Sequence, residues 1–158
     1  MQNHISCHAV ADYFLLQVDF PADDSISHLK LQKLCYYAQA WHLALHGKPL
    51  FGERIEAWAH GPVVPELYKR FKANGWQTID PQSLRTDPMG EIASEDRTFL
   101  DQVWERYGGR MGRQLENMTH AEAPWKDTYG DRETGEKCQD EITQKAMREF
   151  YTAKLVTA

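Results

Sequence analysis

The sequence is poor in cysteine and has no long apolar run. Its three cysteines, Cys7, Cys35 and Cys138, are odd in number and far apart, and none belongs to a CxxC pair. This is not a disulfide framework, which favours a reducing compartment. No run of about 18 apolar residues could span a membrane, and no cationic N-terminal start leads into an apolar stretch. We therefore expect a cytoplasmic protein without a membrane partner.

An excess of positive charge is also missing. The formal net charge is −5, and small basic groups such as Lys69, Arg70 and Lys72 are balanced by nearby acids. Phosphate contacts supply most of the non-specific affinity for nucleic acids, so proteins that bind them usually carry a basic excess. The charge balance therefore argues against nucleic acid as a partner.

Common catalytic motifs are absent as well. The sequence has no GxSxG nucleophile motif, no glycine-rich phosphate-binding loop and no close carboxylate pair with a matching base. Cys35 falls on the inner side of a predicted helix, where a thiol is inert rather than nucleophilic. We therefore predict that the protein is not an enzyme and has no catalytic residue, no bound metal and no cofactor.

Aromatic residues, in contrast, are plentiful. Five tryptophans, seven tyrosines and six phenylalanines occur among 158 residues, of which 42% are hydrophobic and 26% charged. Rings in this number need burial, which argues against disorder. The length fits one domain. We predict a single domain over residues 1–158, with its core between residues 5 and 155.

Residues 28–46 carry the strongest helical pattern. Apolar residues repeat at spacings of three and four from Leu31 to Leu45, and a second apolar strip lies on the opposite side. A helix that is apolar over most of its circumference is usually central and buried. Ser27 suits the N-cap of this helix, and Gly47 suits the position just beyond its C-terminus.

Further elements are predicted around this helix. Helices are expected over residues 5–18, 65–75, 94–107, 113–121 and 141–154, a short strand within 49–58, and irregular chain over 76–93 and 126–139. Pro65 fits the first turn of its helix, and Ser94 can cap the next one. The predicted fold class is mainly α: a compact single-domain helical bundle around the central buried helix 28–46, with a small β element near 50–64.

Seven histidines support an alternative, a histidine-based metalloprotein or enzyme. His42 lies within the apolar stripe of the central helix, whereas His60 and His120 end elements shortly before a proline, so the three could converge on a pocket. The structural interpretation is that His42 is a core histidine bonded to a backbone carbonyl and that the other two anchor turns. Two histidine pairs, His42 with His46 and His4 with His8, have the four-residue spacing that can place two imidazoles on one metal, but no third ligand lies near the pairs in sequence, which favours the structural interpretation.

Gln32, Lys33 and Gln39 form one polar strip on the central helix. These side chains can meet solvent or loop backbone, or they can line a groove that binds another protein. The sequence does not decide between these interpretations.

Three stretches together resemble a known family. They are LKLQKLCYYAQAWHLALHGKPLF (residues 29–51), ERIEAWAHGPVVPELYKRFK (residues 53–72), and the segment from Phe99 to Asp127, which contains THAEAPW. In this order they are similar to the Panacea domain, the family of SocA-like antitoxins and phage-associated GepA-like proteins.

The resemblance implies a mostly helical domain with a small β element and no established catalytic activity. Members of the family act in bacterial and phage toxin–antitoxin systems, where they neutralise a cognate toxin by direct protein binding. The SocA-like branch also acts as an adaptor that hands its toxin to a ClpXP-type protease. The expected partners are therefore a toxin and such a protease.

The resemblance also selects candidate site residues. Those carried over from the family motifs, with a pocket or structural role, are Trp41, His42, Trp58, His60, Pro62, His120 and Trp125. Within AWAHGPVVPELY, residues 57–68, Trp58 and His60 are expected to fix a corner at which a strand turns into a helix. Partner contacts are expected at Gln32, Lys33 and Gln39, and at two aromatic residues predicted to be exposed in loops, Trp76 and Tyr129.

Overall fold

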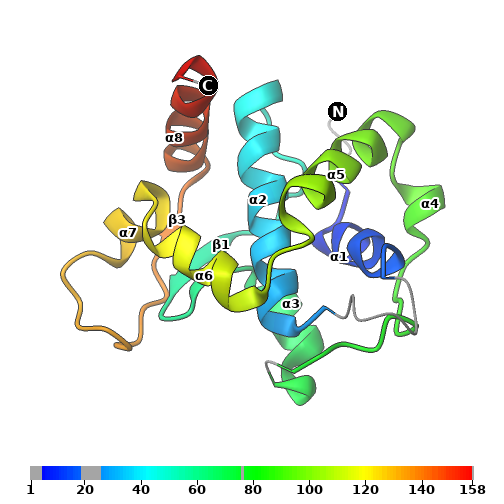
Figure 1. Cartoon of the computed structure of the whole chain (residues 1–158), viewed down its shortest axis with the longest axis horizontal. Helices are drawn as coiled ribbons and strands as arrows, with labels where there is room; N and C mark the ends of the chain where they lie inside the picture. Colours follow the sequence, from blue (N-terminus) through cyan, green and yellow to red (C-terminus); the bar gives the residue numbers. More distant parts are fainter. Residues whose placement is uncertain (1–4, 19–25, 76, 158) are drawn as a thin grey trace.

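The central helix lies where the sequence pattern predicts it. The computed structural model describes residues 5–18, 26–75 and 77–157, and in it helix α2 (His28–His46) runs through the middle of the molecule (Figure 1). The Ser27 hydroxyl accepts a hydrogen bond from the Lys30 N–H, and Gly47 ends the helix with a left-handed φ of 71°. Both predicted caps are confirmed, because a hydroxyl satisfies a free backbone donor and glycine adopts positive φ without steric cost.

Helices on both sides cover α2. On one side lie α1 (Cys7–Leu16), α4 (Pro88–Glu91) and α5 (Ser94–Tyr107), and on the other side lie α6 (Gly112–His120), α7 (Ala123–Tyr129) and α8 (Gln144–Thr157) (Figure 1). Helix α3 (Pro65–Phe71) and the 3₁₀ turn η1 (Lys72–Asn74) lie near the N-terminal end of α2. The predicted mainly α fold class is confirmed. None of the helices in the described ranges is long and apolar enough to cross a bilayer.

The small β element is a three-stranded antiparallel sheet. Strand β1 (Ile55–Trp58) lies between β2 (Gly61–Val63) and β3 (Glu141–Ile142). Along β1, buried and half-buried residues alternate, which is the pattern that a strand with one face on the core produces. A turn at residues 59–60 joins β1 to β2, and α3 follows. The predicted strand-to-helix corner is therefore a β-hairpin followed by a helix.

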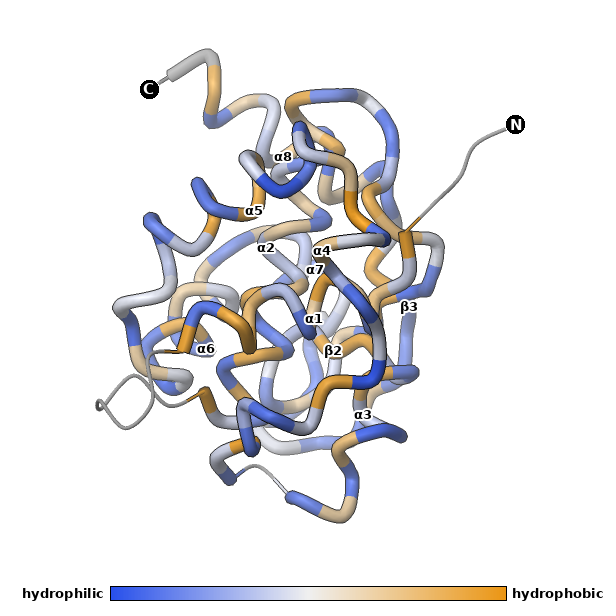
Figure 2. Tube along the Cα trace, turned by 90° about the vertical axis from the view of Figure 1, so that its right-hand side faces the viewer, coloured by the Kyte–Doolittle hydropathy of each residue, from blue (hydrophilic) through white to orange (hydrophobic). Residues whose placement is uncertain are grey.

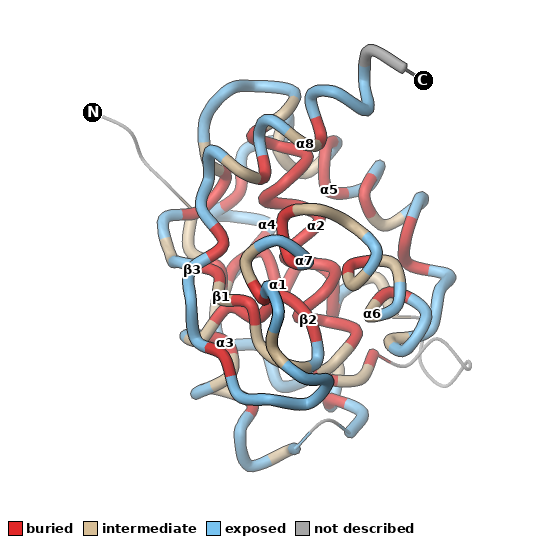
Figure 3. Tube along the Cα trace, turned by 90° about the vertical axis from the view of Figure 1, so that its left-hand side faces the viewer, coloured by how far each residue is buried: buried red, intermediate tan, exposed pale blue. Residues whose placement is uncertain are grey.

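Helix α2 is buried although it is not uniformly apolar. Its buried residues include the polar side chains of Gln32, Lys33, Gln39 and His42. Hydrophilic and hydrophobic residues alternate along much of the chain (Figure 2), whereas the buried residues gather around α2 (Figure 3). A buried polar side chain needs a hydrogen-bond partner to offset its desolvation. The loops and strands around α2 supply such partners.

Four local predictions in the second half are wrong. The residues up to Tyr129 are helical rather than irregular, because Pro124 starts α7 in its first turn. Pro88 likewise starts the short helix α4 within a stretch expected to be irregular. Residues 141–142 form β3 instead of the first turn of the last helix. Ser94 is the first residue of α5 rather than its cap, since Ala93 occupies that position.

A buried carboxylate ties the segment before α4 to α1. Asp12 is fully buried, and its side chain accepts hydrogen bonds from the Arg70 guanidinium, from the backbone N–H groups of Arg85 and Thr86, and from the Thr86 hydroxyl. These donors offset the cost of burying a charge. The backbone at residues 85–86 is therefore fixed by one side chain of α1.

Candidate functional site

Two side chains of α2 bond to the backbone of the β1–β2 hairpin and of Val64, the residue that follows it. The Gln32 side-chain oxygen accepts a hydrogen bond from the Val64 N–H at 2.8 Å, and Lys33 Nζ donates to the Pro62 carbonyl at 3.1 Å. Both side chains are fully buried. Residues of the polar strip therefore replace solvent as the partners of the hairpin backbone.

Helices α6 and α7 also pack against the hairpin. Trp125 Nε1 donates to the Trp58 carbonyl at 2.7 Å, and the Trp125 ring stacks on the His120 imidazole with centroids 4.0 Å apart. The backbone of Ala59, in the turn, favours the charged form of His120 and so opposes the lowering of its pKa by burial. Motif residues from α2, α6 and α7 thus meet around one hairpin, and those of α2 and α7 hold its main chain.

Gly61 allows these elements to approach closely. Its φ is 102°, and a Cβ at this position would lie 2.7 Å from Lys33 Cε and 3.0 Å from Thr119 Oγ1. A side chain would meet both the unfavourable φ and the two neighbours. Glycine is therefore required where β2 passes over the buried end of Lys33.

A cluster of titratable groups lies beside the turn. The Glu116 carboxylate is 3.2 Å from His60 Nδ1 and 3.9 Å from His120 Nε2. Burial lowers the pKa of His120; Glu116 opposes this shift, while Lys33 and His60 add to it. Burial also lowers the pKa of Lys33 from 10.5 to about 7, and Glu116 again opposes the shift. A buried amine that titrates near neutral pH thus lies beneath the turn.

The structure brings His60 and His120 together, but not His42. His42 is buried near the other end of α2, where its Nδ1 lies 2.7 Å from the Lys48 carbonyl, so its prediction as a core histidine is confirmed. His60 projects from the turn, as predicted, but its side chain is 60% exposed and lies outside the packed corner. Within the described ranges, no three or more histidine, cysteine, aspartate or glutamate side chains are grouped to hold a metal ion.

The residues expected to contact a partner are mostly inside the molecule. Gln32, Lys33 and Gln39 are buried, and the Gln39 amide bonds to the backbone of residues 50–51, so the loop-backbone interpretation of the polar strip is correct. Tyr129 is only 4% exposed because its ring stacks on Trp125, so its predicted exposure is wrong. Trp76 lies outside the described residues.

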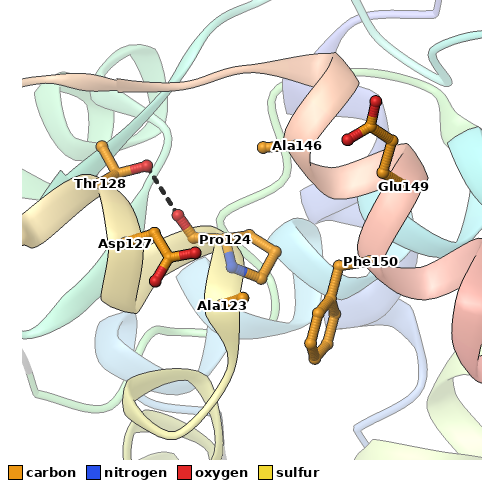
Figure 4. Close-up of a pocket in the computed structure, with 7 residues that line it drawn as sticks. All are labelled: Ala123, Pro124, Asp127, Thr128, Ala146, Glu149 and Phe150. Carbon is orange, nitrogen blue, oxygen red and sulfur yellow. Dashed lines mark hydrogen bonds between the residues drawn. The ribbon is translucent and has the colours of Figure 1, made fainter.

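Hollows on the described surface offer places for a partner. One of about 410 Å³ lies beside the hairpin turn and has Trp58, His60 and Tyr68 in its lining. Another of about 330 Å³ lies between α7 and α8 (Figure 4). A smaller one of about 140 Å³ lies where α2, α5 and α8 meet; it is bordered by Leu45 and Leu155, both of which are exposed. The sequence pattern places Leu45 on the inner stripe of α2, so its exposure is a further correction.

The fold and this site define a mainly helical domain whose buried polar residues position a β-hairpin. Residues 31–126 match the family described as Antitoxin SocA-like, Panacea domain. The chain is also 34% identical over 130 residues to Antitoxin SocA of Caulobacter vibrioides (strain NA1000 / CB15N), an alignment that covers 77% of this chain and 69% of that protein. The chain therefore belongs to the SocA-like Panacea-domain family, as the resemblance predicts. No solved structure matches it significantly.

Proposed function

We propose that this protein is an antitoxin that neutralises a cognate toxin by direct protein–protein binding. The observation that carries the proposal is its similarity to Antitoxin SocA over 77% of the chain. The polar side chains around the hairpin fit a binding protein rather than an enzyme. Lys33, Gln32 and Trp125 each form a hydrogen bond with the backbone of the hairpin or of Val64, which gives these side chains a structural role.

Co-expression tests this function. The gene adjacent to this one in its genome is induced alone, together with the full chain, or together with a version of the chain that has an early stop codon. We expect the adjacent product alone to stop growth, the full chain to restore it, and the truncated version to fail. A C-terminal tag on the full chain should then purify both proteins in a fixed ratio.

Growth and binding together can contradict neutralisation by direct binding. If the adjacent product stops growth and the full chain neither restores growth nor binds that product, neutralisation by direct binding is wrong for this pair. If the full chain restores growth but forms no complex with the adjacent product, neutralisation is indirect, for example through control of toxin synthesis.

We further propose that the antitoxin delivers its toxin to a ClpXP-type protease, as the family resemblance implies. The half-life of the toxin is measured with and without the antitoxin, in cells that have or lack the protease. Delivery predicts a shorter half-life only when antitoxin and protease are both present. An unchanged half-life would leave neutralisation by binding alone.

A further inference from the structure

Helices α7 and α8 leave a hollow of about 330 Å³ between them (Figure 4). Its apolar lining, called the floor here, consists of Pro124 and Phe150 with the small side chains of Ala123 and Ala146 beside them. Thr128 also lines the hollow, and its hydroxyl donates to the Pro124 carbonyl. Small residues between two helices leave room for side chains of another molecule to enter. The hollow is therefore shaped to receive apolar anchor groups.

Two carboxylates border this floor. Asp127 on α7 and Glu149 on α8 lie on opposite sides of Pro124 in Figure 4, and both residues are exposed. Across the part of the chain that the structure describes, Asp127 forms no ion pair, and Glu149 has only a contact of 3.9 Å with Lys145, where both side chains are well exposed. Such an exposed pair contributes little. Both rims therefore present negative charge to a partner.

Lys154, a cation near the hollow, does not cancel this charge. Lys154 Nζ lies 5.1 Å from the centre of the Phe150 ring, but it is paired with Glu122 at 3.9 Å. The lining itself includes no lysine or arginine, in contrast to the hollows that include Lys137 and Arg106. An apolar floor between two acidic rims is thus a feature of the α7–α8 hollow.

The chemistry of the hollow selects its occupant. Apolar side chains suit the floor, and lysine or arginine residues beside them suit the two rims. A basic amphipathic helix presents both groups, since it has an apolar stripe with lysine or arginine residues on either side. Amphipathic helices commonly bind in apolar grooves. The volume is at the small end for a ligand pocket, so it fits anchor side chains of a longer segment. A stable complex buries about 1,600 Å² in total, so the contact would continue beyond the hollow.

We propose that the α7–α8 hollow is the place where this protein docks a basic amphipathic helix of its toxin. The proposal rests on the proposed antitoxin function and adds the surface and the partner chemistry to it.

The test uses the product of the adjacent gene, made by cell-free synthesis, as the probe in calorimetric titrations with the full chain. Asp127→Lys and Glu149→Lys should each weaken binding about tenfold, because each reverses a charge that attracts the partner. The double variant should also lose most of the salt dependence of binding. Ala146→Tyr should block binding sterically, since it fills the hollow.

Matched controls carry the same chemical changes elsewhere. Glu105→Lys reverses an exposed charge on α5, on the other side of α2 (Figure 1). Thr152→Tyr adds the same ring to an exposed position of α8 that lies about 120° around the helix from Ala146. Both controls should bind like the wild type. Melting temperatures identify any variant that fails to fold, and the two surface charge reversals decide the outcome if Ala146→Tyr is such a variant.

The outcomes separate this proposal from the proposed function. Docking in the hollow is supported if the hollow variants lose binding while the two controls keep it. It is also supported if a lysine-to-glutamate change in the partner helix restores the binding of Asp127→Lys. Wild-type affinity in all hollow variants overturns the docking site and leaves the antitoxin function intact. Failure of the wild type to bind overturns the function and the docking site together. A wild-type dimer that Ala146→Tyr converts to monomers would show that a second copy occupies the hollow, which also overturns the proposal.

Discussion

Replacement of Lys33 by methionine tests whether a buried amine limits the stability of this fold. Lys33 is fully buried, and burial lowers its pKa to about 7, whereas the unfolded chain has a value near 10.5. Between these values the unfolded state binds more protons than the folded state, so wild-type stability should rise with pH and fall as pH drops towards 7. The slope approaches about 1.4 kcal/mol per pH unit. From pH 7.5 to 9.5, the wild type should gain roughly 2–3 kcal/mol relative to Lys33→Met, which lacks this titration.

Urea unfolding at several pH values measures this difference. Comparison with Lys33→Met removes the contribution of cysteines and tyrosines, because both proteins contain them. Lys69→Met is the matched control, since it makes the same substitution at a side chain that is 72% exposed. The methionine also leaves the Pro62 carbonyl without its donor, which adds a cost of about 1–3 kcal/mol that does not depend on pH. A stability difference that stays flat with pH would refute the buried, largely neutral state of Lys33.

Three further changes test other parts of the structure. Gly61→Ala should lower the free energy of unfolding by about 2–4 kcal/mol in urea titrations, since positive φ and contact with Lys33 both oppose a side chain; an unchanged value would contradict the close approach. Asp12→Ala should cost about 3–5 kcal/mol by thermal unfolding, because it leaves a buried guanidinium without its partner, and a loss below about 1 kcal/mol would argue against the ion pair. His60→Ala should change stability by less than about 0.5 kcal/mol, since its side chain is 60% exposed, and a clear drop in melting temperature would show that it supports the turn after all.

Elements with local signals could be predicted from the sequence. Helix α2 has a capping serine, a terminal glycine and a continuous apolar pattern, and its observed ends coincide with the prediction. Strand β3 has no such signal, because two residues are too short for a pattern and pair with β1 from far along the chain. Pro88 and Pro124 did carry a signal, since both begin helices that the composition of their surroundings concealed.

The candidate site was only partly predictable for the same reason. The polar strip on α2 could be read from the sequence, but its partners at Pro62 and Val64 lie about 30 residues away and become visible only in the fold. The hollow between α7 and α8 was not predictable, because the polar composition around residues 126–129 indicates an exposed loop, although Tyr129 is helical and buried. A polar composition predicts exposure on average. Tyr129 is an exception, because its ring is buried while its hydroxyl bonds to the carbonyls of residues 133 and 136.

The way in which the hairpin is held has a consequence for how such a protein can diversify. Carbonyl and amide groups are shared by nearly all residue types, so an anchor made through Trp58, Pro62 and Val64 main-chain atoms does not depend on what the turn displays. Ala59 and His60 can therefore change in size, charge or polarity while the frame beneath them stays the same. A lineage of such chains could acquire new recognition properties at the turn by point substitution, without first having to rebuild its interior.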